Sequence, residues 1–174
     1  MNNNKGFTLI EMVVVIVILG ILAVNAAPRF LNIQEDARVS VLEGAKGAIT
    51  AANEIVYGKS AIEGEEGAQV AAVMYHGNTI NTTYGNIMAS EPPSITNSTS
   101  IDFNVTGMKY SAIAPNGKKF EALGSGIYLG DELFNGNDVE ETKCFLFATN
   151  VPYDQPTVAM HKGDLVFSME TAGC

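Results

Sequence analysis

The sequence predicts an α+β protein in which a long N-terminal helix packs, by its second half, on a C-terminal antiparallel sheet. An apolar run over residues 7–27 passes into a helical pattern of apolar residues that lasts to about residue 57. The last part of the chain then alternates short apolar segments with turn residues, which is typical of strands in series.

Composition limits the class of protein. The chain has 174 residues, with 19 acidic against 10 basic side chains and a formal net charge of −9. The length suits one domain with an appendage, and the acidic balance argues against a nucleic-acid binder, which needs clustered lysine and arginine. Hydrophobic residues make up 47% of the chain, but they concentrate in the run 7–27, where 17 of 21 are hydrophobic. A simple cytoplasmic globule does not explain that concentration.

The apolar run has three interpretations. It reaches the roughly 20 residues that a helix needs to cross a bilayer. It could be a secretory signal peptide, cleaved at the small residues around Ala26. It could be a permanent single-span anchor, although Lys5 and Arg29 give it only sparse positive flanks. It could also be a segment that is held in a membrane first and buried against protein partners later.

Glu11 bears on that choice. A carboxylate at membrane depth costs of order 2.5–3.5 kcal/mol, so an acidic residue inside an apolar run is expected to be functional. The alternative is that Glu11 lies near the lipid headgroups and reaches the interface.

Residues 5–11 read Lys-Gly-Phe-Thr-Leu-Ile-Glu and lead into a Val/Ile/Leu segment. This pattern resembles the prepilin signature of type IV pilins and type II secretion pseudopilins. The resemblance implies that a prepilin peptidase cleaves between Gly6 and Phe7 and methylates the new amine of Phe7. Residues 1–6 would then be a leader, 7–29 the membrane and filament-core half of the helix, and 30–174 a pilin head.

In that family Glu11 would serve assembly. Cleavage leaves an ammonium on Phe7, which can pair with Glu11 of a neighbouring subunit. A subunit docked at the wrong height would leave a charge unpaired in an apolar core, so the pair would set the register.

Gly20 and Pro28 interrupt the apolar half of the helix. Within a helix, glycine costs about 1 kcal/mol and proline about 3 kcal/mol. The resemblance implies that the stretch between them can lose helical structure when subunits pack into a filament.

The second half of the helix is predicted to be amphipathic and to end at Gly58, with Lys59 as a helix-end cation. A helix over 7–57 would be about 75 Å long. The apolar stripe expected to pack on the body consists of Phe30, Ile33, Ala37, Val41, Gly44, Ala48, Ala52 and Ile55.

The remaining elements are predicted from local patterns. A short helix is expected over 65–74 and an exposed loop over the Asn/Ser/Thr-rich residues 77–100. A hairpin is expected over 101–113, turning at Thr106 and Gly107. Further predicted strands cover 126–129, 143–149, 157–160 and 165–169, with a turn at 161–164 before the last of them.

Cys144 and Cys174 are the two cysteines. An exported protein meets an oxidising compartment, where a disulfide between them would contribute roughly 3.7 kcal/mol in the chain-entropy model. The resemblance agrees, because pilins commonly bracket a C-terminal loop region in this way. The alternative, a metal or redox pair, has neither CxxC spacing nor a neighbouring histidine cluster.

We expect no enzyme activity, cofactor or metal. The acidic stretch 130–144 does not fit the spacing of an EF-hand calcium loop, and no catalytic or nucleotide-binding fingerprint occurs in the chain.

Within the pilin family, residues 13–24, 26–32 and 36–38 resemble pilins of the mannose-sensitive haemagglutinin (MSHA) group. That resemblance implies a homopolymeric filament for surface attachment and biofilm formation. Its partners would be the prepilin peptidase and an inner-membrane assembly platform with cytoplasmic ATPases. The chain would lie in the inner membrane of a Gram-negative bacterium before assembly and on the cell surface afterwards.

Two other functions stay open. A type II secretion pseudopilin, which forms a short periplasmic piston, would share the helix and Glu11. A secreted binding module or enzyme with an ordinary signal peptide would instead begin at Ala27.

Overall fold

The structure, a computed structural model, describes residues 7–100, 103–113, 119–130, 134–150 and 163–174. The chain divides into two compact units, Met1–Ala37 and Arg38–Cys174, which we call the N-terminal unit and the head. One helix, α1 (Leu9–Glu63), contributes residues to both units.

In the N-terminal unit, α1 keeps its apolar side chains uncovered. No residue of Leu9–Ala26 is buried, and this segment is long and apolar enough to cross a membrane. The helix continues through Gly20 and Pro28 in the single chain. The expected loss of helix between them concerns packed subunits and stays a prediction.

α1 ends later than predicted, at Glu63 instead of near Gly58. Gly64 follows with a positive φ of 77°. Its N–H donates to the carbonyl of Ala61, and the N–H of Glu65 donates to the carbonyl of Ser60. This pair of bonds is the Schellman motif that ends many helices at a glycine, so Gly64 is the glycine that ends α1.

The predicted apolar stripe is not the face that α1 buries in the head. Val41 and Ile55 are 48% and 51% exposed, and among the described side chains of that stripe only Ala52 is buried. The buried face consists of Leu42, Ala45, Ile49, Ala52 and Val56. α1 thus carries two adjacent apolar faces here, and periodicity does not reveal which of them its own chain covers.

A small antiparallel sheet contains β1 (Ala71–Tyr75), β2 (Asn78–Thr83) and β3 (Asn86–Ile87), in that order. It is followed by α2 (Pro92–Ser98). The predictions of a helix over 65–74 and of a loop over 77–100 are therefore wrong.

Two-residue turns explain this error. His76 and Gly77 join β1 to β2, Tyr84 and Gly85 join β2 to β3, and all four residues have positive φ. Such turns suit the twist of a hairpin. His-Gly and Tyr-Gly are weaker sequence signals for them than Asn-Gly or Asp-Gly.

The larger sheet contains β4 (Asn104–Ile113), β5 (Lys119–Tyr128), β6 (Phe145–Asn150) and β7 (Leu165–Glu170), antiparallel and in that order. The predicted hairpin turn at Thr106 and Gly107 is wrong, because both residues pair with β5 inside one long strand. The strands over 143–149 and 165–169 are confirmed as β6 and β7. The predicted strand 157–160 lies outside the described residues, as does the start of the turn 161–164.

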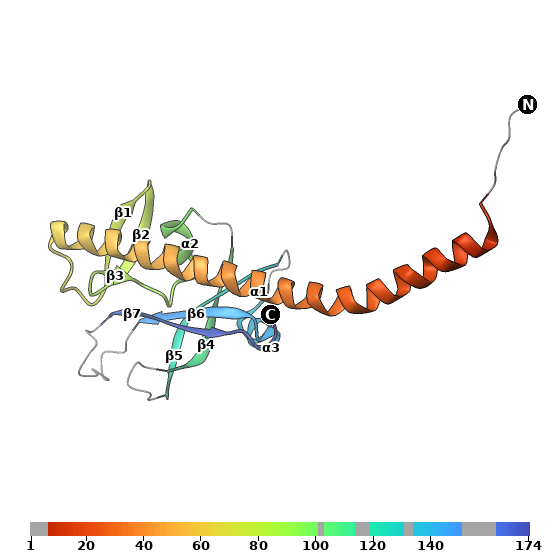
Figure 1. The fold of residues 1–174 in the computed structure, drawn as a ribbon. Coiled ribbons are helices and arrows are strands. Elements are labelled where there is room, and N and C mark those ends of the chain that lie inside the picture. The colour runs from red at the N-terminus through yellow and green to blue at the C-terminus, as the bar shows by residue number, and fades with distance from the viewer. Residues whose placement is uncertain (1–6, 101–102, 114–118, 131–133, 151–162) are drawn as a thin grey trace, which may run out of the picture. The chain divides into compact units, whose positions relative to one another are not determined.

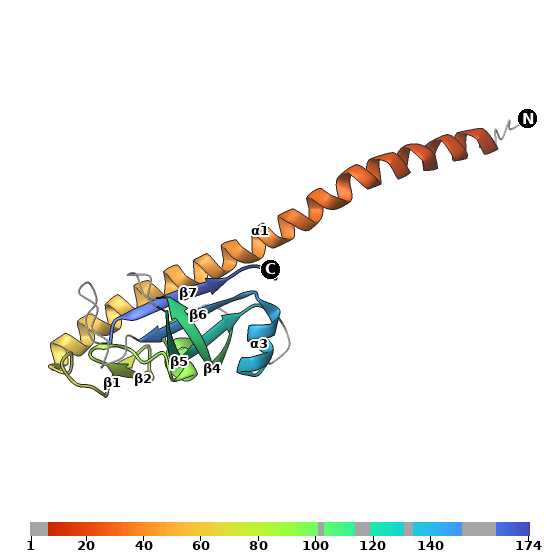
Figure 2. The ribbon, with the colours of Figure 1, turned by 90° about the horizontal axis from the view of Figure 1, so that it is seen from below.

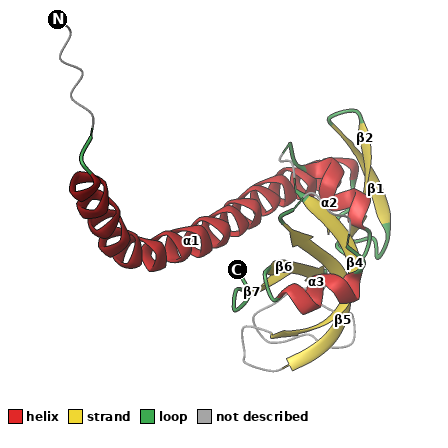
Figure 3. Cartoon of the chain, turned by 90° about the vertical axis from the view of Figure 1, so that its right-hand side faces the viewer, coloured by secondary structure: helices red, strands yellow, loops and turns green. Residues whose placement is uncertain are grey.

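The larger sheet is strongly twisted. Ten residue pairs join β4 to β5, but only three join β5 to β6, so most of the β4–β5 hairpin extends beyond β6. In Figures 1 and 2 this hairpin crosses β6 and β7 at a steep angle. The helix α3 (Gly136–Thr142) packs on β4, β5 and β6 (Figure 3).

The main core joins the head half of α1 to both sheets, which lie against it in Figure 1. Its members include Ile49 of α1, Ile80 of β2 and Leu146 of β6. A second cluster, with Val139 of α3 and Phe147 of β6, fills the space under α3. These observations confirm the predicted α+β class.

Two side-chain amides connect these layers, the buried Asn53 and the partly buried Asn150. Asn53 of α1 donates to Asn86 Oδ1 and accepts from the N–H of Ile87, both at 2.8 Å. Asn150, at the end of β6, accepts from the N–H of Ala89 and donates to the carbonyls of Ile87 and Gly163. Each amide satisfies backbone groups that would be costly to bury unpaired.

Candidate functional site

The predicted assembly residues lie at the start of α1, where the structure shows a capping box. Thr8 precedes the first helical residue and Glu11 occupies the third helical position. The N–H of Thr8 donates to Glu11 Oε2 at 2.8 Å, and the N–H of Glu11 donates to Thr8 Oγ1 at 3.3 Å. These reciprocal bonds satisfy backbone donors that the first turn of a helix leaves free.

A third bond ties the two side chains directly. The Thr8 hydroxyl donates to Glu11 Oε2 at 2.7 Å. This carboxylate oxygen therefore accepts two hydrogen bonds from one residue, whereas Glu11 Oε1 accepts none from the residues that the structure describes. The carboxylate also lies at the positive end of the helix dipole, which favours its charge.

Sequence reasoning identified Glu11 and missed Thr8. The signal was present, because threonine followed three residues later by glutamate, just before an apolar run, is the pattern of a capping box. Within its own chain the Glu11 carboxylate accepts from Thr8, and its pairing with the ammonium of a neighbouring subunit stays a prediction.

Phe7, the residue expected to become the methylated terminus, is 82% exposed. Gly6 lies outside the described residues, so the predicted cleavage bond is at the edge of what the structure describes.

The disulfide between Cys144 and Cys174 is formed. Its surroundings fix the last residues of the head. The N–H of Gly173 donates to the carbonyl of Lys143, and Arg38 of α1 donates to the carbonyl of Cys174 at 3.1 Å. Both cysteines pack against the main core.

The head also has a polar cavity of about 620 Å³ on the side of the larger sheet where β4, β7 and α3 meet. It is lined by Lys109, Tyr110, Ser111, Glu121, Glu140, Ser168, Met169 and Glu170. None of the residues that the sequence singled out as a site lines it.

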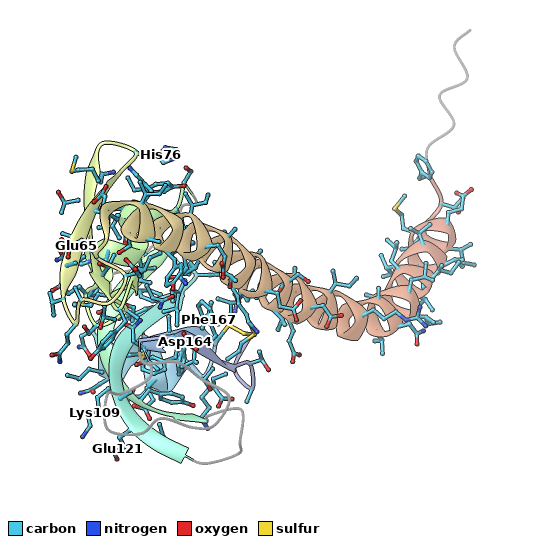
Figure 4. The ribbon with its side chains drawn as sticks, turned by 90° about the vertical axis from the view of Figure 1, so that its left-hand side faces the viewer. Glu65, His76, Lys109, Glu121, Asp164 and Phe167 are labelled. Carbon is cyan, nitrogen blue, oxygen red and sulfur yellow. A yellow bond between two sulfur atoms is a disulfide. The ribbon has the colours of Figure 1, made fainter. Side chains whose placement is uncertain are left out.

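Charged residues that line this cavity shift one another's pKa values and that of Tyr110. Burial, together with the carboxylates of Glu170 and Glu140, raises the pKa of Tyr110. Lys109 and Glu121 form an exposed ion pair at 2.8 Å, visible on the β4–β5 hairpin in Figure 4. Their mutual hydrogen bond and attraction raise the pKa of Lys109 and lower that of Glu121. The described residues include no group of three His, Cys, Asp or Glu side chains placed to bind a metal ion.

Comparison with known proteins finds a family model that matches the N-terminal end and two relatives that match part of the chain. Residues 1–24 match the family model described as the prokaryotic N-terminal methylation motif. The type IV narrow pilus major component PilA5 of Thermus thermophilus is 44% identical over 48 residues, which cover 28% of this chain and 41% of that protein. The type II secretion system core protein G of Pseudomonas aeruginosa is 51% identical over 49 residues, covering 28% of this chain and 34% of that protein.

These matches extend over well under half of each relative's length. No solved structure gives a significant match. The chain therefore has the N-methylation segment typical of type IV pilins and type II secretion pseudopilins, and each of these two relatives matches 28% of it.

Proposed function

We propose that this chain is a structural subunit of a type IV pilus that polymerises through α1. The observation that carries the proposal is the apolar segment Leu9–Ala26, in which no residue is buried and most of which lies within the N-methylation motif matched over residues 1–24. So large an apolar surface must be covered by lipid or by other protein chains. Storage in a membrane followed by packing into a filament core covers it in both states.

The exposed apolar face of α1 in the head supports the same function. It contains Val41, Gly44, Ala51 and Ile55. Small residues allow close approach of another backbone, and the larger ones supply buried area. A neighbouring subunit is the partner that fits a polymer.

Glu11 would set the height at which subunits join. Cleavage after Gly6 would expose an ammonium on Phe7, and a neighbour's Glu11 would pair with it. In an apolar core, breaking such a pair leaves a charge uncompensated, which is strongly destabilising.

We further propose that the filament is a pilus of the MSHA group and that it acts in surface attachment and biofilm formation. The prepilin peptidase, an inner-membrane platform and its cytoplasmic ATPases would be the partners. The motif and the exposed apolar helix fit anchoring in an inner membrane followed by assembly into a pilus. That the cell is a Gram-negative bacterium is part of the proposal.

The test is to shear fibres from producing cells, image them, and determine the mass of this chain and its N-terminus. We expect fibres built from a chain that begins at methylated Phe7. A chain that begins at Ala27 would refute the proposal and support an ordinary secreted protein.

Glu11→Ala tests the assembly role directly. We expect fibres to be lost while the head stays folded, because Glu11 belongs to the N-terminal unit and contacts Thr8. Fibre yield and the thermal unfolding of the detergent-solubilised chain measure the two outcomes. Wild-type fibre yield would contradict the role of Glu11.

A pseudopilin is the second candidate, supported by the similarity to core protein G over 49 residues. A strain that lacks the chain separates the two functions. Loss of surface fibres with normal secretion indicates a pilin, whereas a secretion defect without loss of fibres indicates a pseudopilin.

A further inference from the structure

We propose that the polar cavity of the head binds a small organic dication, a linear diamine or polyamine. The volume of the cavity, about 620 Å³, lies within the roughly 300–1,000 Å³ of small-ligand sites. The site needs no neighbouring subunit, so this proposal is independent of the proposed function.

The cavity lies on the face of the larger sheet that is turned away from α1. Successive residues of a strand point to opposite faces. In β6, Leu146 belongs to the main core with α1, whereas Phe145 and Phe147 belong to the second cluster. Tyr110 of β4 packs against that second cluster and lines the cavity. Contacts that other molecules make along α1 are therefore separate from those that a ligand makes here.

The ring of Tyr110 forms one wall of the cavity and is held in place from several sides. It meets the rings of Phe145 and Phe147 edge to face, with centroids 5.1 and 5.4 Å apart. Its hydroxyl donates to Glu170 Oε2 at 3.5 Å. A wall that is fixed before the ligand arrives loses less freedom on binding. The face of an aromatic ring also attracts cations.

The charges in the lining favour a ligand with two positive charges. One lysine and three glutamates line the cavity. Lys109 and Glu121 pair with each other on the β4–β5 hairpin (Figure 4), and no ion pair among the described residues neutralises Glu140 or Glu170. Both of these carboxylates act on the same space, because they add to the effect of burial in raising the pKa of Tyr110. An anion would be repelled, whereas a dication would match the two carboxylates.

An organic dication fits this arrangement better than a metal ion does. The described residues include no group of three His, Cys, Asp or Glu side chains placed to share one ion. Glu140 lies on α3 and Glu170 on β7, and the space between such carboxylates suits two ammonium groups joined by methylenes. Each ammonium has three donors, and the hydroxyls of Ser111 and Ser168 in the lining can accept from them.

Binding of putrescine to the full chain in a neutral detergent tests the proposal. Isothermal titration calorimetry at constant ionic strength measures the affinity. Butylamine, with the same carbon chain and one ammonium, and the diol of the same length, with none, are the comparison ligands. We expect putrescine to bind, butylamine to bind about tenfold more weakly because it loses one charged hydrogen-bonding group, and the diol not to bind.

Three substitutions separate this site from the general attraction of an amine to an acidic protein. Glu140→Gln and Glu170→Gln keep the size of the side chain and remove its charge, and each should weaken putrescine binding about tenfold. Glu141 is exposed on α3, next to Glu140, but does not line the cavity. Glu141→Gln is therefore the matched control and should change the affinity by less than about twofold.

Each contrary result overturns the proposal. Failure of putrescine to bind removes the ligand, and equal binding of butylamine removes the need for a second charge. Equal weakening by all three substitutions would mean that binding follows the overall acidity of the protein. The Tm of each variant reports its folding. If Glu170→Gln lowers the Tm, the exposed Glu140 decides the matter, and wild-type affinity in Glu140→Gln rejects the site.

Discussion

The two parts of α1 differ in what covers their apolar side chains. In the N-terminal unit no residue of Leu9–Ala26 is buried, whereas in the head Leu42, Ile49 and Val56 are fully buried by both sheets. The same kinds of residue therefore stabilise the fold in one part of the helix and are available to other molecules in the other. Hydrophobic sequence alone does not separate these roles.

The largest expected contrast is between Ile49 and Ile16. Ile49→Ala should lower the free energy of unfolding of the head by about 2–5 kcal/mol, because it leaves a cavity in the main core. Ile16 is 64% exposed, and Ile16→Ala should leave that free energy unchanged within about 0.5 kcal/mol. Denaturant unfolding in detergent micelles measures the free energy of unfolding of both variants. Equal destabilisation by the two substitutions would mean that the two parts of α1 do not differ in their contribution to stability.

The disulfide should stabilise the head and leave the N-terminal unit unaffected. Replacing Cys144 and Cys174 together by serine should lower the free energy of unfolding of the head by about 2–4 kcal/mol, since the unfolded chain gains freedom. A reductant added to the wild-type chain should give the same shift and should not affect the double variant. A shift in only one of these experiments would contradict this role.

Substitution of Ile55 tests whether the exposed face of α1 in the head contacts other subunits, as is proposed for the N-terminal unit. Ile55→Ser should change the stability of the head by no more than about 0.5 kcal/mol, because the side chain is half exposed. It should nevertheless reduce fibre yield. Its neighbour Glu54 is also exposed, so Glu54→Ser is the matched control. Equal fibre yields for the two variants would show that this face is not part of an interface.

The smallest effect is expected at the exposed pair Lys109–Glu121. The lowered pKa of Glu121 gives a contribution that is present above its ordinary pKa and lost as the pH falls through the lowered one. The raised pKa of Lys109 gives a contribution that is lost as the pH rises through it. Lys109→Met should therefore lower the Tm slightly near neutral pH, and not at either extreme or in high salt. A deficit in Tm that is independent of pH would mean that packing is responsible.

Long-range features of the head were less predictable than its local patterns. The α+β class, β6, β7 and the long helix followed from local periodicity. The end of α1 at Gly64 did not, because Gly58 offered the same local signal earlier in the chain. The two small hairpin turns at His76–Gly77 and Tyr84–Gly85 depend on positive φ. These residue pairs are only weak sequence signals for positive φ.

The start of α1 was predictable in part. The motif around Glu11 was plain in the sequence, and Thr8 could have been found from the capping-box pattern. The choice of buried face on α1 could not, because it depends on which side the sheets cover, and that is a contact between segments far apart in the chain.

The order in which the head is made has a kinetic consequence. The buried face of α1 is synthesised before any strand, yet its core partners include Leu146 and Ala148 of β6. Folding of the head must therefore close contacts of large sequence separation, which is intrinsically slow. Until β6 is made, part of the buried face of α1 lacks its core partners, and Cys144 has no disulfide partner until Cys174 follows. We expect the emerging chain to need protection from aggregation until β6 is complete.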